Sequence, residues 1–270
     1  MRSDKQICIQ LLVGILCLIV LGSANLIAQT PFVTDNADVT EKGKFHFEFM
    51  NEFDRLQTTS FPLRYQNGTR ATIAYGIAKS VEISVTGQFL YLIGENHPRS
   101  VGGIGDTTVA GKYNFRSEKA NSWLPAFTIS AFVQVPSGNA RRGLGSGVTD
   151  LGINAIAQKT IHKKHVFRLN AGTLFSGNTL TGAIGFVVVR GLVFTGGASY
   201  VRTISEKLQL GGEVAGALTS NFHLSQGQLQ TQFGGNYRLA KQTTFDFGLI
   251  AGRFAASPRF GLQLGLSHDF

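Results

Sequence analysis

The stretch of sequence that decides the fold is residues 260–270, which reads Phe-Gly-Leu-Gln-Leu-Gly-Leu-Ser-His-Asp-Phe. Bulky apolar residues occupy every second position from Phe260 to Leu266, and small or polar residues lie between them. Because successive side chains of a β-strand point to opposite faces, this alternation predicts a strand with one continuous apolar face. An edge strand of a soluble sheet is the alternative, and it is disfavoured because exposed apolar edges promote aggregation.

This stretch resembles the C-terminal assembly signal of bacterial outer-membrane β-barrels, an apolar alternating strand that ends on an aromatic residue. His268 departs from the aromatic that is more usual two residues before the end. The resemblance implies a barrel in outer-membrane lipid that is recognised by the barrel-assembly machinery. The residues that would carry the signal are Leu262, Leu264, Leu266 and Phe270.

The N-terminus has the order of a secretory signal peptide: basic residues, an apolar run over residues 7–21 and then small residues. The run is short for a membrane-spanning helix, so a retained anchor is the less favoured alternative. We expect residues 1–28 to be a signal peptide cleaved after Ala28, or after Ala24. Both cysteines lie inside it, which leaves the exported chain without a thiol for a disulfide, a metal site or catalysis.

Alternating segments recur along the rest of the chain, and no later segment has the roughly twenty consecutive apolar residues of a membrane helix. We therefore expect an all-β fold: a closed antiparallel transmembrane β-barrel of about twelve strands over residues 44–270, after a periplasmic segment at 29–43. Residues 183–202 admit two assignments, with a strand favoured near 191–202. The expected strands are 44–53, 70–77, 81–93, 105–116, 123–135, 148–161, 166–175, 191–202, 208–218, 228–239, 244–254 and 260–270.

The width of such a barrel indicates which face of each strand meets lipid. Apolar side chains alone cannot fill an interior of this size, so the polar rows would line a hydrated lumen and the apolar rows would face lipid. The turns near Lys79, Ser117, Lys163, Glu206 and Lys241 are short, and most of the loops at the other end are longer. This asymmetry is typical of outer-membrane barrels, whose short turns face the periplasm. A β-sandwich behind a signal peptide is the alternative fold.

The charge of the chain does not point to nucleic acid. The formal net charge is +9, but the basic residues are dispersed, and many fall in expected turns, such as Lys163-Lys164 and Glu118-Lys119. A nucleic-acid-binding chain would gather its basic residues on one face or along one helix. These residues are therefore interpreted as solvated turn residues, with some in the lumen.

Three stretches together resemble a known family. They are Pro-Phe-Val-Thr-Asp-Asn-Ala-Asp at 31–38, Gly-Ile-Gly-Asp-Thr-Thr-Val-Ala-Gly-Lys-Tyr at 103–113 and Val-Gln-Val-Pro-Ser-Gly at 133–138. In order and spacing they are similar to motifs of the outer-membrane transporters grouped with the meta-pathway of phenol degradation. The resemblance implies an outer-membrane β-barrel that passes small molecules, aromatic or apolar ones among them.

A search for catalytic or metal-binding constellations gives none that we adopt, and no cofactor is expected. Ser146 between two glycines in a loop lacks the strand-to-helix context of a nucleophile elbow. His223 and Ser225 lie close together only in sequence, and the histidines have no metal-ligand spacing. The residues Asp35, Asn36 and Asp38 could bind a cation, but an Asx-type turn or an N-terminal plug is favoured. We therefore expect no enzyme.

The candidate site is the charged part of the inward rows. These side chains could form charge clusters that set the size and selectivity of a pore for small solutes, or they could satisfy one another across a plugged lumen. The corresponding functions are a passive channel, with residues 136–147 as constriction or entrance, and a closed structural or adhesion barrel that acts through its loops. The residues are Glu48, Glu52, Arg70, Glu82, Asp106, Lys112, Arg168, Glu213, Arg238 and Asp246.

Overall fold

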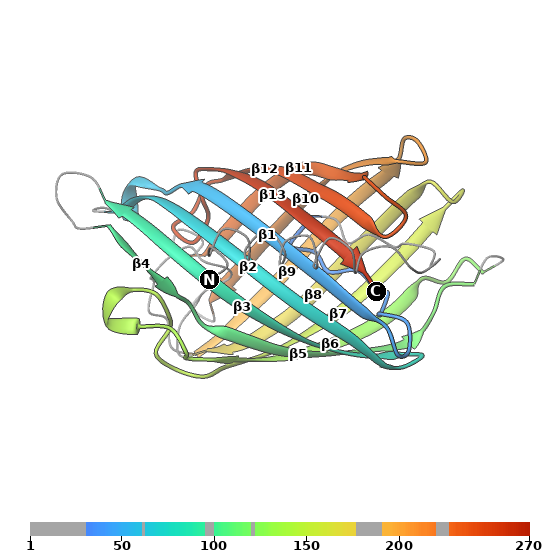
Figure 1. Ribbon diagram of the computed structural model, residues 1–270, viewed down its shortest axis with the longest axis horizontal. Coiled ribbons are helices and arrows are strands. Elements are labelled where there is room, and N and C mark those ends of the chain that lie inside the picture. Colours follow the sequence, from blue (N-terminus) through green and yellow to red (C-terminus); the bar gives the residue numbers. More distant parts are fainter. Residues whose placement is uncertain (1–30, 61–62, 95–99, 120–121, 177–190, 220–226) are drawn as a thin grey trace, which may run out of the picture.

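The computed structural model describes residues 31–60, 63–94, 100–119, 122–176, 191–219 and 227–270, and Figure 1 shows them as a barrel of tilted strands. The expected signal peptide and the pair His223 and Ser225 lie outside the described residues. The strands are β1 (Phe45–Arg55), β2 (Leu63–Ala78), β3 (Val81–Gly94), β4 (Val101–Ile104), β5 (Thr107–Arg116), β6 (Ala126–Val135), β7 (Asp150–Ile161), β8 (His165–Ser176), β9 (Gly191–Thr203), β10 (Leu208–Thr219), β11 (Gln228–Arg238), β12 (Thr243–Gly252) and β13 (Phe260–Asp269).

The strands form one closed antiparallel sheet. Except at β4 and β5, each strand pairs with its neighbours in the chain. β13 closes the barrel by pairing with β1 along its whole length, from His46 opposite Asp269 to Arg55 opposite Phe260. Both β4 and β5 pair with β3, so they are two pieces of one stave, and the closed barrel has twelve staves. This confirms the expected closed barrel of about twelve antiparallel strands.

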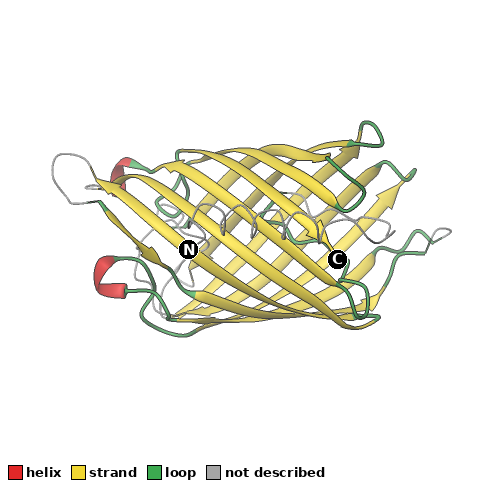
Figure 2. Ribbon diagram, in the orientation of Figure 1, coloured by secondary structure: helices red, strands yellow, loops and turns green. Residues whose placement is uncertain are grey.

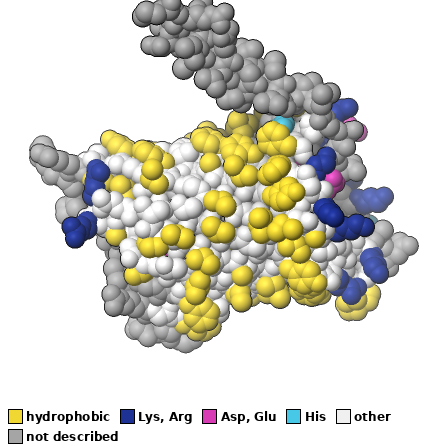
Figure 3. Space-filling view, turned by 60° about the horizontal axis from the view of Figure 1, so that its bottom comes forward, with side chains coloured by type: hydrophobic (Ala, Val, Ile, Leu, Met, Phe, Trp, Pro, Cys, Tyr) yellow, Lys and Arg dark blue, Asp and Glu magenta, His cyan; other side chains and the backbone are white. Residues whose placement is uncertain are grey.

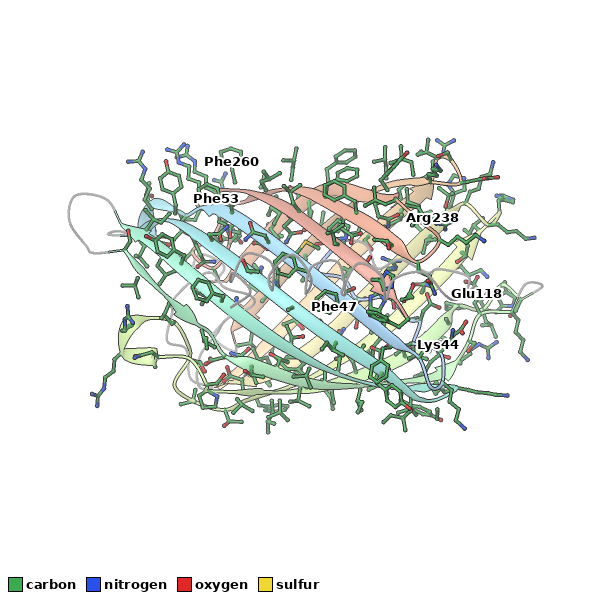
Figure 4. All side chains as sticks on the ribbon, in the orientation of Figure 1. Lys44, Phe47, Phe53, Glu118, Arg238 and Phe260 are labelled. Carbon is green, nitrogen blue, oxygen red and sulfur yellow. The ribbon has the colours of Figure 1, made fainter. Side chains whose placement is uncertain are left out.

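Two short 3-10 helices, η1 (Thr58–Ser60) and η2 (Ala140–Arg142), lie in loops at the same end of the barrel (Figure 2). No helix in the described part of the chain is long and apolar enough to cross a membrane. The short turns after β2, β7 and β9 lie at the opposite end. Figure 4 places Phe53 and Phe260 at the loop end and Lys44, Glu118 and Arg238 at the turn end.

The side chains are distributed inside out compared with a soluble protein. Along β13, Phe260, Leu262, Leu264 and Leu266 are exposed on the outer surface, whereas the residues between them are buried. Figure 3 shows the apolar side chains as a wide field between the two ends of the molecule. Because the inward side chains are mostly polar and the outward ones mostly bulky and apolar, the barrel suits a lipid exterior. Buried inward residues include Gln66, Thr128, Asn170, Gln232 and Gln263.

The sequence-based boundaries differ from the structure mainly at the loop end of β2 to β4. β2 begins at Leu63 rather than at residue 70, and β4 lies within the predicted loop 94–103. The Gln-Asn-Gly at 66–68 is typical of a turn, and the paired glycines of β4 are poor strand formers. Both preferences are overridden by pairing, since β2 lies between β1 and β3, and the ring of Tyr91 packs over Gly102.

One turn at the opposite end is held by a partly buried contact. The carboxylate of Glu118 accepts hydrogen bonds from Lys159 Nζ (2.5 Å) and from the backbone N–H of Thr160 (3.0 Å). Desolvation works to raise the pKa of Glu118, but these hydrogen bonds outweigh it and lower the pKa. Since the pKa is lower in the folded than in the unfolded state, this contact stabilises the turn at neutral pH and is lost as acid protonates Glu118.

Candidate functional site

The candidate site is the lumen, which encloses a cavity of about 560 Å³. Its walls come from β1 to β3 and from β5 to β11. Residues outside the strands complete its lining: residues 32–36, which precede the barrel, Asp106, and residues 143–146, which belong to the loop between β6 and β7. The cavity therefore lies between an N-terminal segment and an inward-folded loop.

Residues 31–40, called here the N-terminal segment, run inside the barrel. The backbone N–H groups of Val33 and Thr34 donate to the carboxylate of Glu213 on β10 (2.8 and 2.9 Å). The N–H of Asp35 donates to the side chain of Asn170 on β8 (2.8 Å). The sequence placed residues 29–43 in the periplasm. The described part instead enters the lumen because an extended polar chain meets the hydrogen-bonding needs of the inward side chains.

The same segment is fastened on the opposite wall by charge. The Lys112 ammonium on β5 lies 2.9 Å from the Asp35 carboxylate and also donates to the side chain of Asn36 (3.1 Å). Glu82 on β3 accepts from the N–H of Thr40 (2.7 Å). The Asn36 side chain accepts from the N–H of Asp38 (3.1 Å), which is the Asx-type turn expected from the sequence. Asp35 and Asn36 thus hold a lysine, which supports a plug rather than a cation site.

A third contact joins the segment to β7 and β8. The guanidinium of Arg168 donates to Gln158 Oε1 (3.0 Å), and Gln158 Nε2 donates to the carboxylate of Asp38 (2.8 Å). Arg168 and Gln158 are both largely buried. The charges of the N-terminal segment are therefore matched by the wall, and the segment crosses the lumen from β10 to β3.

A further charged group lies on β1 and its neighbours, away from the N-terminal segment. Glu52 accepts from Arg70 on β2 (3.0 Å) and from Gln263 on β13, which joins three adjacent strands. Towards the turn end, His46 lies between Glu48 and Asp269 at the seam where the barrel closes. These contacts hold the first and last strands in register and leave Glu48, Glu52 and Arg70 on the cavity wall.

Asp106, at the break between β4 and β5, holds the loop 136–147 inside the barrel mouth. Its carboxylate accepts from the N–H groups of Gly138 (2.9 Å) and Ser146 (2.6 Å) and from Gln134 Nε2 (3.2 Å). A β-carbon on Gly145 would lie only 2.3 Å from Asp106 Oδ1, so the loop approaches this closely because it has glycine there. The loop is thereby fixed as part of the cavity wall.

Two apolar patches also face the lumen near the loop end. The first joins Leu144 of the loop to Leu90 and Leu92 of β3, all nearly fully buried. The second is made by Leu174, Val193 and Ala217 on β8, β9 and β10, with Phe132 of β6 packed against it. The sequence-based candidate list missed these residues because it included only charged side chains. Following the inward row of β3 beyond Gln88 would have found Leu90 and Leu92.

Seven of the ten predicted residues line the cavity, and the other three are placed differently. Glu213 accepts a hydrogen bond from the N–H of Thr34 in the N-terminal segment, and Asp246 is buried and accepts a hydrogen bond from Ser267. Arg238 is half-buried at the end of β11, near the turn to β12. Among the described residues, no group of three or more His, Asp or Glu side chains is arranged to hold a metal ion. The cavity-lining residues are Glu48, Glu52, Arg70, Glu82, Asp106, Lys112 and Arg168.

Comparisons with solved structures agree with this architecture. An outer membrane channel from Pseudomonas putida F1 superposes with a TM-score of 0.63 at 10% identity, covering 90% of this chain and all of the other. The NanC porin gives a TM-score of 0.57 at 10% identity over 82% of this chain and 98% of its own. The KdgM porin in complex with disordered oligogalacturonate gives a TM-score of 0.55 at 10% identity, over 83% of this chain and 99% of its own. No curated protein matches the chain in sequence.

A closed antiparallel barrel with apolar rows outside and a polar, partly filled lumen defines the outer-membrane β-barrel class, and the fold matches channels of the Gram-negative outer membrane. Within this class, residues 28–270 match the family described as the MetA-pathway of phenol degradation. The chain belongs to that family, as the three motifs of its sequence indicated.

Proposed function

We propose that the protein is a passive channel through which small solutes cross the outer membrane. The observation that carries the proposal is the cavity of about 560 Å³ inside the barrel, which is lined by charged, polar and apolar groups. Charged side chains on the cavity wall and two apolar patches near the loop end together suit solutes that combine an apolar part with a polar one. The family description, which concerns phenol degradation, favours aromatic compounds among them.

A closed barrel that acts through its loops is the second candidate, and one observation favours it. The N-terminal segment makes hydrogen bonds to β3, β5, β7, β8 and β10, so it occupies much of the lumen. In a channel this segment narrows the pathway, whereas in a closed barrel it seals the pathway.

Single-channel recording in planar bilayers distinguishes the two, with Lys112→Gln as the variant. Loss of this buried cation leaves Asp35 without its ion-pair partner and removes the positive charge near Glu82, so a conducting lumen should shift its preference towards cations. Lys241→Gln removes the same charge from an exposed turn and is the matched control. Stepwise currents whose reversal potential shifts only in Lys112→Gln support the channel. A folded barrel without current supports the closed alternative.

We also propose that residues 1–28 direct export and are removed, and that the C-terminal strand is read by the barrel-assembly machinery. The outward apolar face of β13 supports the second proposal, with Leu262, Leu264 and Leu266 all exposed on one side. The N–H of Phe270 also donates to the carbonyl of Phe45 at the closing seam (2.9 Å). Deleting Phe270 should sharply reduce the heat-modifiable form recovered from membranes. Unchanged recovery would contradict the proposal.

A separate prediction concerns the loop at the barrel mouth. Asp106→Ala leaves the N–H groups of Gly138 and Ser146 without their acceptor, at a cost of about 1–3 kcal/mol. The loop should then leave the lumen more often, and trypsin should cleave the folded protein faster at Arg141 and Arg142. Gln134→Ala, which removes a contact to Asp106 but not to the loop, is the control. Equal cleavage rates in both variants would show that Asp106 does not hold the loop.

A further inference from the structure

The loop end of the barrel carries cations that the solute pathway does not use. In the described segments 55–64, 136–149 and 253–259, which hold loops and adjoining strand ends, every charged residue is an arginine, and none is Asp or Glu. At the opposite end the cations are lysines of the turns and strand-end arginines (Arg116, Arg202 and Arg238), and they are mixed with glutamates such as Glu118 and Glu206. Figure 3 agrees: basic side chains stand without acidic ones at its left end, whereas both occur at its right end. The arginines of the loop end are Arg55, Arg64, Arg141, Arg142, Arg253 and Arg259.

Four of these arginines lie together where the loop between β12 and β13 meets the ends of β1 and β2. They are called here the arginine cluster: Arg55, Arg64, Arg253 and Arg259. Arg55 ends β1 in the outward row and lies opposite Phe260 of β13 and Tyr65 of β2. The N–H of Arg259 donates to the carbonyl of Arg55 (2.8 Å). Arg253 follows Gly252, whose N–H faces the carbonyl of Arg259 at 3.4 Å.

The backbone that presents the cluster is fixed without a ligand. Ser257 is fully buried between Arg253 and Arg259, and its hydroxyl both donates to the carbonyl of Leu229 (3.0 Å) and accepts from its N–H (2.9 Å). Three cations, Arg55, Arg253 and Arg259, are therefore held exposed and close together by main-chain contacts. Such an arrangement of like charges gains most from a polyvalent anion.

The cluster lies at the lipid boundary rather than in the pore. Phe53, Tyr65 and Phe260 occupy the outward row next to it, and the rings of Phe53 and Tyr65 stack 5.8 Å apart. Aromatic side chains of this kind form the girdle at the interface of membrane barrels. The guanidinium of Arg64 lies over the ring of Tyr65, 5.7 Å from its centre. The neighbouring Asp54 points inward and is fully buried, so it does not neutralise this surface.

We propose that the arginine cluster binds the phosphate groups of the phosphorylated glycolipid in the outer leaflet, the lipid A part of lipopolysaccharide. The longer loops place this end outside the cell, where that lipid forms the leaflet. A guanidinium matches a phosphate with two parallel hydrogen bonds, which an ammonium cannot do, so the arginines of the cluster suit this group. The site fixes the barrel to its annular lipid and is independent of solute passage.

The test is a titration of the folded barrel in neutral-lipid nanodiscs with bisphosphorylated lipid A, using its dephosphorylated form and inorganic phosphate as the comparison probes. Binding of bisphosphorylated lipid A should weaken about tenfold or more in the double variant Arg55→Gln and Arg259→Gln. The matched control is Arg141→Gln with Arg142→Gln, which removes the same charge from exposed η2 in the loop between β6 and β7. Its binding should equal that of the wild type.

The remaining outcomes are also decisive. Replacing Arg55 and Arg259 with lysine keeps the charge but loses the paired hydrogen bonds of the guanidinium, so binding of intermediate strength is expected. This variant is the substitute if the double glutamine variant fails to fold. Equal binding of dephosphorylated lipid, an equal loss in the Arg141 and Arg142 variant, or displacement by inorganic phosphate at comparable concentration would each overturn the proposal. Conductance should be unchanged in the cluster variants, which separates this site from the channel.

Discussion

Removal of residues 29–40 should raise the single-channel conductance severalfold while the barrel still folds. The N-terminal segment donates hydrogen bonds to side chains on opposite walls, Glu213 and Glu82, so its removal takes away a segment that crosses the lumen. The barrel should persist because closure between β1 and β13 begins at Phe45 and does not use the segment. The measurement is conductance in planar bilayers, with heat-modifiable mobility as the check on folding.

A point substitution offers a second route to the same result. Gly76 of β2 faces the lumen where the segment enters, and a β-carbon there would lie 2.2 Å from the carbonyl oxygen of Glu41. Gly76→Ala should therefore displace the entering chain and raise conductance in the same direction. Gly87→Ala, at a position on β3 with no atom within 4 Å of the added carbon, is the control. If Gly76→Ala and the deletion both conduct like the wild type, the segment does not limit passage.

The strands and their faces were predictable because the side-chain period of two is a local signal. The row from Phe45 to Phe53 and the row from Phe260 to Leu266 both face outward, as alternation requires. Charge on the opposite rows then predicted a polar lumen. The same logic applied to Leu90 would have placed an apolar patch inside, because position in the row, rather than residue type, fixes the face.

What fills the lumen was less accessible to sequence. Thr34 bonds to Glu213 across 179 positions in the chain, and no local pattern specifies such a pair. The hydrogen bonds from Gly138 and Ser146 to Asp106 likewise depend on how the barrel brings its loops together. The only local signal was the run of Asp, Asn and Asp near residue 36, which favoured a turn or a plug but could not say where the plug would bind.

The face of the barrel that meets lipid can be tested by one substitution made at two adjacent positions. Val85 of β3 lies in the outward row between Ile73 and Val109, and all three side chains are about half exposed. Val85→Arg places a charge against hydrocarbon and should lower the free energy of unfolding in lipid vesicles by about 2–4 kcal/mol. The neighbouring Ser84 lines the cavity, next in its row to Glu82.

Ser84→Arg is therefore the matched control, with the same new side chain, the same strand and nearly the same depth. Its guanidinium can reach water and the carboxylates of the lumen wall, so the cost should be a fraction of that at Val85. A soluble β-sandwich, the alternative left open by alternation alone, predicts the same order, because there the apolar row is a packed core and the polar row is solvated. It differs from the barrel in that it should keep its fold and its stability in buffer without vesicles. Urea titration of both variants in vesicles, followed by tryptophan fluorescence, measures the difference. A larger loss at Ser84 than at Val85 would mean that the apolar row does not face lipid.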